Sequence, residues 1–156
     1  MRELPYTHSC FVCGVSNASG LKLRFETDGR IVRARFLPRE EHIGFKGVVH
    51  GGILSTVLDE VMFWACVVAT RQFGYCAELG VRFRNPARPR EELIATGEVT
   101  GNRRGRIFDA RGELNPTAGS PVAIATGKYL PIESADLPEM AADFVGDARW
   151  LLRRGE

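Results

Sequence analysis

Two adjacent glycines open the longest apolar segment of this chain, and that segment constrains the fold more than any other. Gly51 and Gly52 precede apolar residues at helical spacing, namely Ile53, Leu54, Val57, Leu58, Val61, Met62, Ala65 and Val68. The opposite side also becomes apolar, at Phe63 and Val67. A helix that is apolar on nearly all sides is buried. We therefore expect a central helix from about Gly51 to about Phe73, covered by a sheet on one side and by a second subunit on the other.

The start of this helix is suited to binding an oxygen atom that gains negative charge. Glycine lets a ligand approach the backbone closely, and the first turn of a helix leaves N–H groups unpaired behind a partial positive charge. His50, Gly51 and Gly52 stand at that position. For His50, two roles stay open: it braces the glycine turn, or it contacts the substrate.

Two acidic residues interrupt the apolar helix. Asp59 and Glu60 lie among Val57, Leu58 and Val61, where a carboxylate needs a specific reason to be present. Asp59 is interpreted as an active-site carboxylate in an apolar cleft, the alternative being a structural ion pair with an arginine from a strand. Glu60 points about 100° away around the helix, so we expect it to be structural or at a subunit interface.

Strands with alternating polarity flank the helix. The first two are expected at 21–26 and 31–36, joined by a hairpin at Asp28-Gly29, and four more are expected at 79–84, 92–100, 108–114 and 123–129. Small residues in the last of these favour close approach to the helix. Short connections favour antiparallel neighbours.

The two ends of the chain show weaker patterns. Residues 1–20 are expected to be irregular. The tail, residues 133–156, is expected to form a short amphipathic helix capped by Asp136, packed on the body or on a partner. With no repeat or linker in view, we expect residues 1–156 to be a single α+β domain, with a curved antiparallel sheet around one long helix and a short C-terminal helix.

Composition excludes several function classes. The net charge of +2, from 21 basic and 19 acidic residues, does not favour a nucleic-acid binder. No apolar leader is visible at the start, and the apolar stretch Val61–Thr70 is too short to span a bilayer. We expect a cytoplasmic location with no membrane partner, and cysteines that are reduced.

One cysteine pair has the spacing of metal ligands. Cys10 and Cys13 form a Cys-x-x-Cys pair with His8 nearby. A complete zinc site needs four ligands, and no second pair follows. The sequence therefore favours thiols packed in an N-terminal loop, and we expect no metal.

The order of strands and helix, together with Val49-His50-Gly51-Gly52 and Leu58-Asp59-Glu60, resembles the hotdog-fold acyl-CoA thioesterases, most closely their phenylacetate-pathway (PaaI-like) branch. The resemblance covers roughly residues 10–132. The Cys10–Gly14 segment, Gly20–Leu23 and Glu78–Pro86 are also similar to one sub-branch. A lone His-Gly-Gly is a weak signal, but with an acid eight residues after its first glycine on a buried helix it is fairly specific.

The resemblance implies roles for individual residues. Asp59 activates water or attacks the thioester carbonyl, the Gly51 N–H polarises that carbonyl, and the site forms between two subunits of a homodimer, which can assemble further into a tetramer. No cofactor is implied beyond the coenzyme A of the substrate. The residues assigned to binding are Gly52, Cys76, Arg84, Asn85, Arg103, Arg104 and Gly105.

The chain departs from the family pattern at two positions. Many relatives have an Asn in the loop before His-Gly-Gly, and residues 42–47 contain none. Cys76 stands where relatives often have Thr or Ser, and a thiol is a weaker hydrogen-bond donor. The arginines have two interpretations, a seat for coenzyme A phosphates or a solvated sheet face, with Arg103 and Arg104 as the better candidates for phosphate binding.

The sequence thus predicts hydrolysis of an acyl-CoA thioester, with Asp59 as general base or nucleophile. Two alternatives stay open: a non-catalytic acyl-CoA binding or sensing protein, and a hotdog-type acyl thioester dehydratase or hydratase. Phe63, Trp64, Met62 and Phe83 suit either an aromatic or a medium-chain acyl group.

Overall fold

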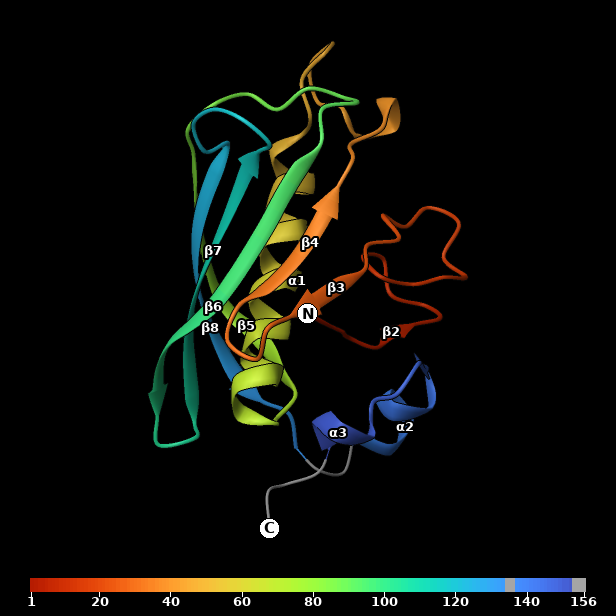
Figure 1. Ribbon diagram of the computed structural model, residues 1–156, viewed down its shortest axis with the longest axis vertical. Helices are drawn as coiled ribbons and strands as arrows, with labels where there is room; N and C mark the ends of the chain where they lie inside the picture. The colour runs from red at the N-terminus through yellow and green to blue at the C-terminus, as the bar shows by residue number, and fades with distance from the viewer. Residues whose placement is uncertain (134–136, 153–156) are drawn as a thin grey trace.

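The computed structural model describes residues 1–133 and 137–152, and it has a sheet that curves around one long helix, α1 (Gly51–Thr70) (Figure 1). All neighbouring strands of the main sheet are antiparallel, in the order β1-β3-β4-β6-β7-β8-β5. Its strands are β1 (Arg2–Glu3), β3 (Phe25–Thr27), β4 (Val32–Phe36), β5 (Gly74–Phe83), β6 (Leu93–Arg103), β7 (Ile107–Pro116) and β8 (Ala123–Pro131). The expected hotdog architecture is confirmed.

Glycines on the sheet let α1 approach it closely. A Cβ on Gly97 of β6 would lie 2.6 Å from the carbonyl oxygen of Val61, and one on Gly112 of β7 would lie 3.0 Å from Met62 Cγ. Real Cβ atoms do not approach a backbone oxygen as closely as 2.6 Å, so position 97 must lack one, and a Cβ at position 112 would require the Met62 side chain to shift. This contact places the middle of α1, where Asp59 and Glu60 lie, directly over the sheet.

The helix is shorter than its apolar pattern predicts. It ends at Thr70 because Arg71 adopts a left-handed conformation, with φ of 58°, and donates its N–H to Val67 O. This is a standard helix C-cap geometry. Phe73, expected near the helix end, is instead a buried residue just before β5.

The alternation expected from Leu21 describes burial correctly but not strand pairing. Leu21 and Leu23 are buried, yet β3 begins only at Phe25. The N–H groups of Leu21 and Leu23 bond to Phe11 O and Val12 O, so this segment pairs with the N-terminal loop. The period-two pattern reports a buried face and does not identify the backbone partner.

The C-terminal tail is not one helix. It comprises α2 (Leu137–Ala142), β9 (Phe144–Val145) and α3 (Arg149–Leu152), and β9 pairs with β2 (Tyr6–Thr7). The expected cap, Asp136, lies outside the described residues. A short 3₁₀ helix, η1 (Glu40–His42), precedes α1.

The N-terminal segment and the tail cover part of the α1 side that faces away from the sheet (Figure 1). Trp64 of α1 is fully buried, and its ring lies 6.2 Å from that of Phe144 and 6.4 Å from that of Phe25. The chain itself therefore supplies some of the cover that we expected from a second subunit. The length and composition of α1 alone would also suit a membrane span, a property shared by core helices such as this one, whose most apolar window is 56% buried.

Candidate active site

The N-terminus of α1 presents one unused backbone donor. His50 caps the helix, with its Nδ1 accepting a hydrogen bond of 2.8 Å from the Gly52 N–H. A Cβ on Gly52 would lie 2.9 Å from this nitrogen, so glycine makes room for the cap. Among the described residues, the Gly51 N–H has no hydrogen-bond partner. The bracing role of His50 is therefore observed, and Gly51 has an N–H available for a ligand.

A cavity of about 420 Å³ lies at this end of α1. Its lining includes His50, Gly51, Phe83, Arg84 and Asn85. The Phe83 ring packs close to the Gly51 Cα, because a Cβ there would lie 3.1 Å from Phe83 Cζ. The Asn85 amide donates to Pro121 O at 2.7 Å, which holds the end of β5 beside the helix start.

Asp59 lies in a different and larger cavity of about 790 Å³. The Tyr129 hydroxyl of β8 donates to Asp59 Oδ1 at 2.8 Å and also lies 3.0 Å from the Asp59 carbonyl oxygen. Cys76, Phe63, Trp64 and Phe144 are further lining residues. The expected structural alternative, an ion pair of Asp59 with a strand arginine, is absent among the described residues.

The sheet positions the Asp59 partner through one glycine. A Cβ on Gly127 would lie 2.7 Å from Tyr129 Cε2, so the ring occupies the space that a side chain at 127 would need. Cys76 of β5 stands opposite Tyr129 in the sheet register. Together these residues line the sheet side of the Asp59 carboxylate.

Tyr129 and Cys76 both keep their protons at neutral pH. Burial, followed by the negative charge of Asp59, raises the pKa of Tyr129 far above its ordinary value. The same two causes, in the same order, raise the pKa of Cys76 to about 11. Both groups are thus neutral beside the Asp59 side chain, and the Tyr129 hydroxyl donates a hydrogen bond to it.

One chain does not bring Gly51 and Asp59 together. They lie eight residues apart on the same helix, which corresponds to about 12 Å along its axis, and they line separate cavities. A ligand carbonyl within hydrogen-bonding distance of the Gly51 N–H cannot also contact Asp59 of that chain.

The arginines expected to bind coenzyme A phosphates do not form one site. Arg84 lies at the N-terminal end of α1, whereas Arg103, Arg104 and Gly105 lie at the tip of the β6–β7 hairpin at the other end of the molecule (Figure 1). Arg103 is engaged in a bidentate ion pair with Asp109, at 2.9 and 3.0 Å. Arg104 is exposed and has a φ of 54°.

Glu60 points to the other side of α1, toward the N-terminal loop. Cys10 Sγ lies 4.0 Å from Glu60 Oε1, and both residues line the 790 Å³ cavity. Burial, followed by the neighbouring charges of Cys10 and Asp59, raises the pKa of Glu60 to about 8. His8, expected near this group, instead has its Nδ1 3.4 Å from Ser16 Oγ.

Comparisons with known proteins agree with this architecture. Residues 46–108, from the loop before α1 to the start of β7, match the family model described as the thioesterase superfamily. A crystal structure described as a thioesterase superfamily protein is 26% identical, with a TM-score of 0.72, and the match covers 79% of this chain and 63% of that chain. The chain has a hotdog fold, and its residues 46–108 are similar to the thioesterase superfamily.

Other similar proteins share less of their sequence with this chain. Acyl-coenzyme A thioesterase 13 of Mus musculus is 25% identical over 85 residues, which cover 54% of this chain and 61% of that protein. The PaaI protein of the E. coli phenylacetic acid degradation operon is 18% identical, with a TM-score of 0.66, 72% of this chain and 81% of that chain being covered. That likeness shows the fold alone, so the expected PaaI-like branch stays a prediction.

A further solved structure of the same fold was determined with a ligand. The smu.793 protein of Streptococcus mutans, bound to acetyl CoA, is 14% identical, with a TM-score of 0.65, and the match covers 70% of this chain and 88% of that chain. The chain spans about three fifths of the length of the first two relatives above, at 63% and 61%.

Sequence reasoning missed Tyr129 as a site residue. We expected it only as part of a buried face of the last strand, and its contact with Asp59 joins residues 70 positions apart. The available signal was a tyrosine on a face otherwise built from small residues, Ala123, Ala125 and Gly127. A buried tyrosine hydroxyl needs a hydrogen-bond partner, and Asp59 is a polar group on the facing helix.

Proposed function

We propose that this protein hydrolyses an acyl-CoA thioester to a carboxylic acid and free coenzyme A, and that its active site forms between two copies of the chain. The observation that carries the proposal is the Asp59 carboxylate, held by the Tyr129 hydroxyl in a cavity of about 790 Å³. The superfamily and the mouse acyl-coenzyme A thioesterase support the reaction class.

The separation of Gly51 from Asp59 is the reason for proposing a shared site. In a two-fold dimer the same surface meets itself, so the α1 start of one copy can face the middle of α1 in the other. The thioester carbonyl then accepts a hydrogen bond from the Gly51 N–H of one subunit, and Asp59 of the second subunit acts on the carbonyl carbon. Each dimer contains two such sites.

The edge strand β5 supports self-association. Tyr75, Leu79 and Phe83 are 55%, 37% and 53% exposed, and they lie on a strand with only one neighbour in the sheet. A long edge strand with exposed apolar side chains is a template for contact with another chain. Phe83 also borders Gly51, which places this surface beside the proposed carbonyl site.

The chemistry needs a nucleophile and a place for developing negative charge. Asp59 either removes a proton from the attacking water or attacks the carbonyl carbon itself, and the two routes stay open. In both, the carbonyl oxygen gains negative charge near the Gly51 N–H and the helix N-terminus. The carbon–sulfur bond then breaks, and the coenzyme A thiolate takes a proton. On the second route the acyl group is left on Asp59 as an anhydride, which water hydrolyses to release the carboxylic acid and restore the Asp59 carboxylate. His50 holds the turn that presents the donor.

The substrate contacts follow from the remaining residues. The aromatic side chains Phe63, Trp64 and Phe144 offer an apolar wall for an aromatic or medium-chain acyl group. Arg84 lines the smaller cavity beside Gly51, and Arg104 is the exposed arginine of the hairpin tip, so these two are the better phosphate contacts. The free thiols of all four cysteines fit the proposed cytoplasmic location.

A subunit-complementation experiment tests both parts of the proposal. Asp59→Asn removes the carboxylate, and Gly51→Pro removes the N–H at a helix position where proline is tolerated. Neither variant alone should release thiol from a panel of acyl-CoA esters. When the two are co-expressed, hybrid dimers contain one intact site, so random pairing should restore about a quarter of the wild-type activity.

The controls separate the alternatives. Gly51→Ala keeps the N–H but places a Cβ 3.1 Å from Phe83 Cζ, so it measures the steric effect of a side chain at this position. The additional loss of activity in Gly51→Pro is then due to the lost donor. Zero activity in the hybrids, with active wild type, would contradict the shared site. Wild-type protein that binds acyl-CoA without releasing thiol would support the sensing protein. Hydration of an enoyl-CoA without thiol release would support the hydratase.

A further inference from the structure

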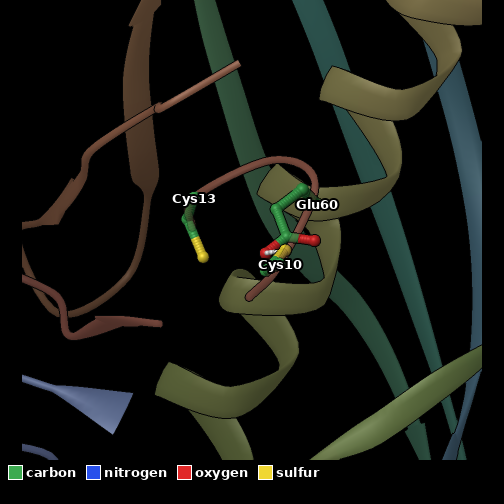
Figure 2. Close-up of side chains that lie close together, drawn as sticks. All are labelled: Cys10, Cys13 and Glu60. Carbon is green, nitrogen blue, oxygen red and sulfur yellow. Dashed lines mark hydrogen bonds between the residues drawn. The ribbon is translucent and has the colours of Figure 1, made fainter. Parts of the chain in front are cut away.

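Three potential metal ligands converge between the N-terminal loop and α1. The Sγ atoms of Cys10 and Cys13 and a carboxylate oxygen of Glu60 all lie within 4.8 Å of one another. Figure 2 shows the two cysteines on the N-terminal loop and Glu60 extending from α1 toward the Cys10 sulfur. Tetrahedral zinc places two sulfur ligands about 3.8 Å apart and a sulfur and an oxygen ligand about 3.5 Å apart. The observed Cys10 Sγ to Glu60 Oε1 separation of 4.0 Å is close to this geometry.

The loop conformation directs hydrogen-bond donors at the Cys10 sulfur. The Val12 N–H donates to Cys10 Sγ at 3.3 Å, and the Cys13 thiol and N–H also favour a charged sulfur. These donors lower the pKa of Cys10 to about 6, with the Cys13 side chain as the largest cause. The turn is tight, since a Cβ on Gly14 would lie 2.2 Å from Cys10 O. A loop that directs N–H groups at a sulfur stabilises the form that binds metal.

Glu60 has no cationic partner among the residues that the structure describes. None of the ion pairs among the described residues includes it, although it lies in a mainly apolar part of α1. Next to it, the indole Nε1 of Trp64 is buried beside the Glu60 carboxyl group and makes no hydrogen bond of ordinary geometry among residues 1–133 and 137–152. A cation bound by Glu60 would keep the carboxylate charged, and a charged carboxylate is a stronger acceptor for this N–H.

We propose that Cys10, Cys13 and Glu60 bind one zinc ion, with the fourth ligand a water molecule on the side of the 790 Å³ cavity. Two thiolates and one carboxylate form a ligand set that zinc accepts. Binding releases the protons of the groups that are neutral beforehand, and these protons pass to solvent. The ion ties the N-terminal loop to the middle of α1, on the opposite side of the helix from Tyr129.

The third ligand favours zinc over a disulfide. A Cys10–Cys13 disulfide would need neither Glu60 nor its position within 4.8 Å of both sulfurs, and its formation would leave the carboxyl without a cation. The Thr7 hydroxyl lies 3.7 Å from Cys13 Sγ and supplies an outer contact to that sulfur. The sequence shows no further ligand pair near Cys10 and Cys13. The third ligand is Glu60, which lies 50 residues after Cys10 on helix α1.

The test measures metal content directly. The full chain is reduced, mixed with equimolar zinc sulfate, dialysed against metal-free buffer and analysed by plasma mass spectrometry. We expect about one zinc per chain. Replacement by cobalt should produce the visible bands of tetrahedral coordination and a near-ultraviolet sulfur-to-cobalt band. Trp64 adjoins Glu60, so its fluorescence should also change on binding.

Variants identify the ligands. Cys10→Ser, Cys13→Ser and Glu60→Gln should each weaken zinc binding by more than about 100-fold, since even outer contacts are worth 10- to 100-fold. Cys66→Ala, on the same helix but outside the cluster, should keep full zinc content. If circular dichroism shows that the cysteine variants do not fold, Glu60→Gln still tests whether this side chain binds zinc. Gln matches the size of the neutral carboxyl group, so we expect this variant to fold.

Three outcomes would overturn the proposal. One is a reduced wild-type chain with less than about a tenth of an equivalent of zinc. Another is unchanged affinity in Glu60→Gln. The third is a chain isolated with a Cys10–Cys13 disulfide that does not bind zinc after reduction. Asp59→Asn should keep its zinc while losing the proposed hydrolysis. Zinc content therefore tests the metal site, and thiol release tests the thioesterase function, each without depending on the other.

Discussion

The two sides of the middle of α1 hold adjacent carboxylates in opposite situations. On the sheet side, Asp59 accepts a hydrogen bond from Tyr129. On the loop side, Glu60 faces the sulfurs of Cys10 and Cys13, and its pKa is raised to about 8 mainly by burial. A rotation of about 100° around one helix therefore separates a carboxyl group held by a tyrosine hydroxyl from one that burial keeps neutral up to about pH 8 without a cation.

The largest expected effect distinguishes the two carboxylates in activity. Asp59→Asn should lower kcat for acyl-CoA hydrolysis by roughly 10²- to 10⁴-fold, because the base or nucleophile is lost. Glu60→Gln, measured under the same conditions by thiol release, should cause a much smaller loss. Equal losses in the two variants would contradict the assignment of the chemistry to the sheet side.

The next effect tests the orienting partner of Asp59. Tyr129→Phe removes a hydroxyl that donates to a carboxylate, and a hydrogen bond to a charged group is worth about 1.5–3 kcal/mol. We expect kcat to fall at least about tenfold with little change in KM. Tyr6→Phe, on β2 and outside the cavity that Asp59 lines, is the matched control. A Tyr129→Phe variant as active as this control would show that the hydroxyl does not position Asp59.

A smaller effect concerns the glycine under that tyrosine. Gly127→Ala introduces a Cβ 2.7 Å from the Tyr129 ring, and such overpacking typically costs about 1–3 kcal/mol of unfolding free energy. Gly80→Ala has open space, with Thr126 Oγ1 at 3.6 Å, and should be nearly neutral. Urea unfolding of the two variants measures the difference. Equal midpoints would mean that the ring moves away at no cost.

The smallest effect is a pH dependence on the loop side. In metal-free protein, Glu60 titrates at about 8 when folded and near its ordinary value of 4.5 when unfolded. Between these values the folded state holds an extra proton, so Glu60 makes stability fall as pH rises from about 4.5 to about 8. Glu60→Gln should lack this fall, so its gain in Tm over the wild type should grow as the pH rises from about 5 to about 8.

The Tm values of the wild type and of Glu60→Gln must be compared at each pH, in the presence of a chelator that keeps both proteins free of metal. Buried His42 has a lowered pKa, so its own contribution is lost as pH falls below its ordinary range, the opposite sign from Glu60. Because His42 is present in both proteins, the difference between their melting curves isolates Glu60. Parallel pH profiles would show that the Glu60 pKa is not raised.

The helix, the order of the six longer strands and the apolar faces were predictable from the sequence, because periodicity reports burial directly. The exact ends of these elements were not predictable. Helix α1 ends at Thr70, where Arg71 forms a left-handed cap at a position that usually carries glycine. The Leu21–Leu23 segment is buried without joining the sheet. Local patterns specify which side chains are buried, whereas hydrogen-bond partners depend on segments distant in the chain.

The candidate site shows the same division. The glycine turn with a capping histidine and the acid on the helix depend on neighbours within one helix, so the sequence by itself determined them. Only the tertiary structure decided that Gly51 and Asp59 lie in separate cavities, that Tyr129 of β8 reaches Asp59, and that Glu60 joins Cys10 and Cys13. The physical reason is that helical geometry determines the direction of a side chain, while what it meets there is determined by the packing of strands and loops that are remote in sequence.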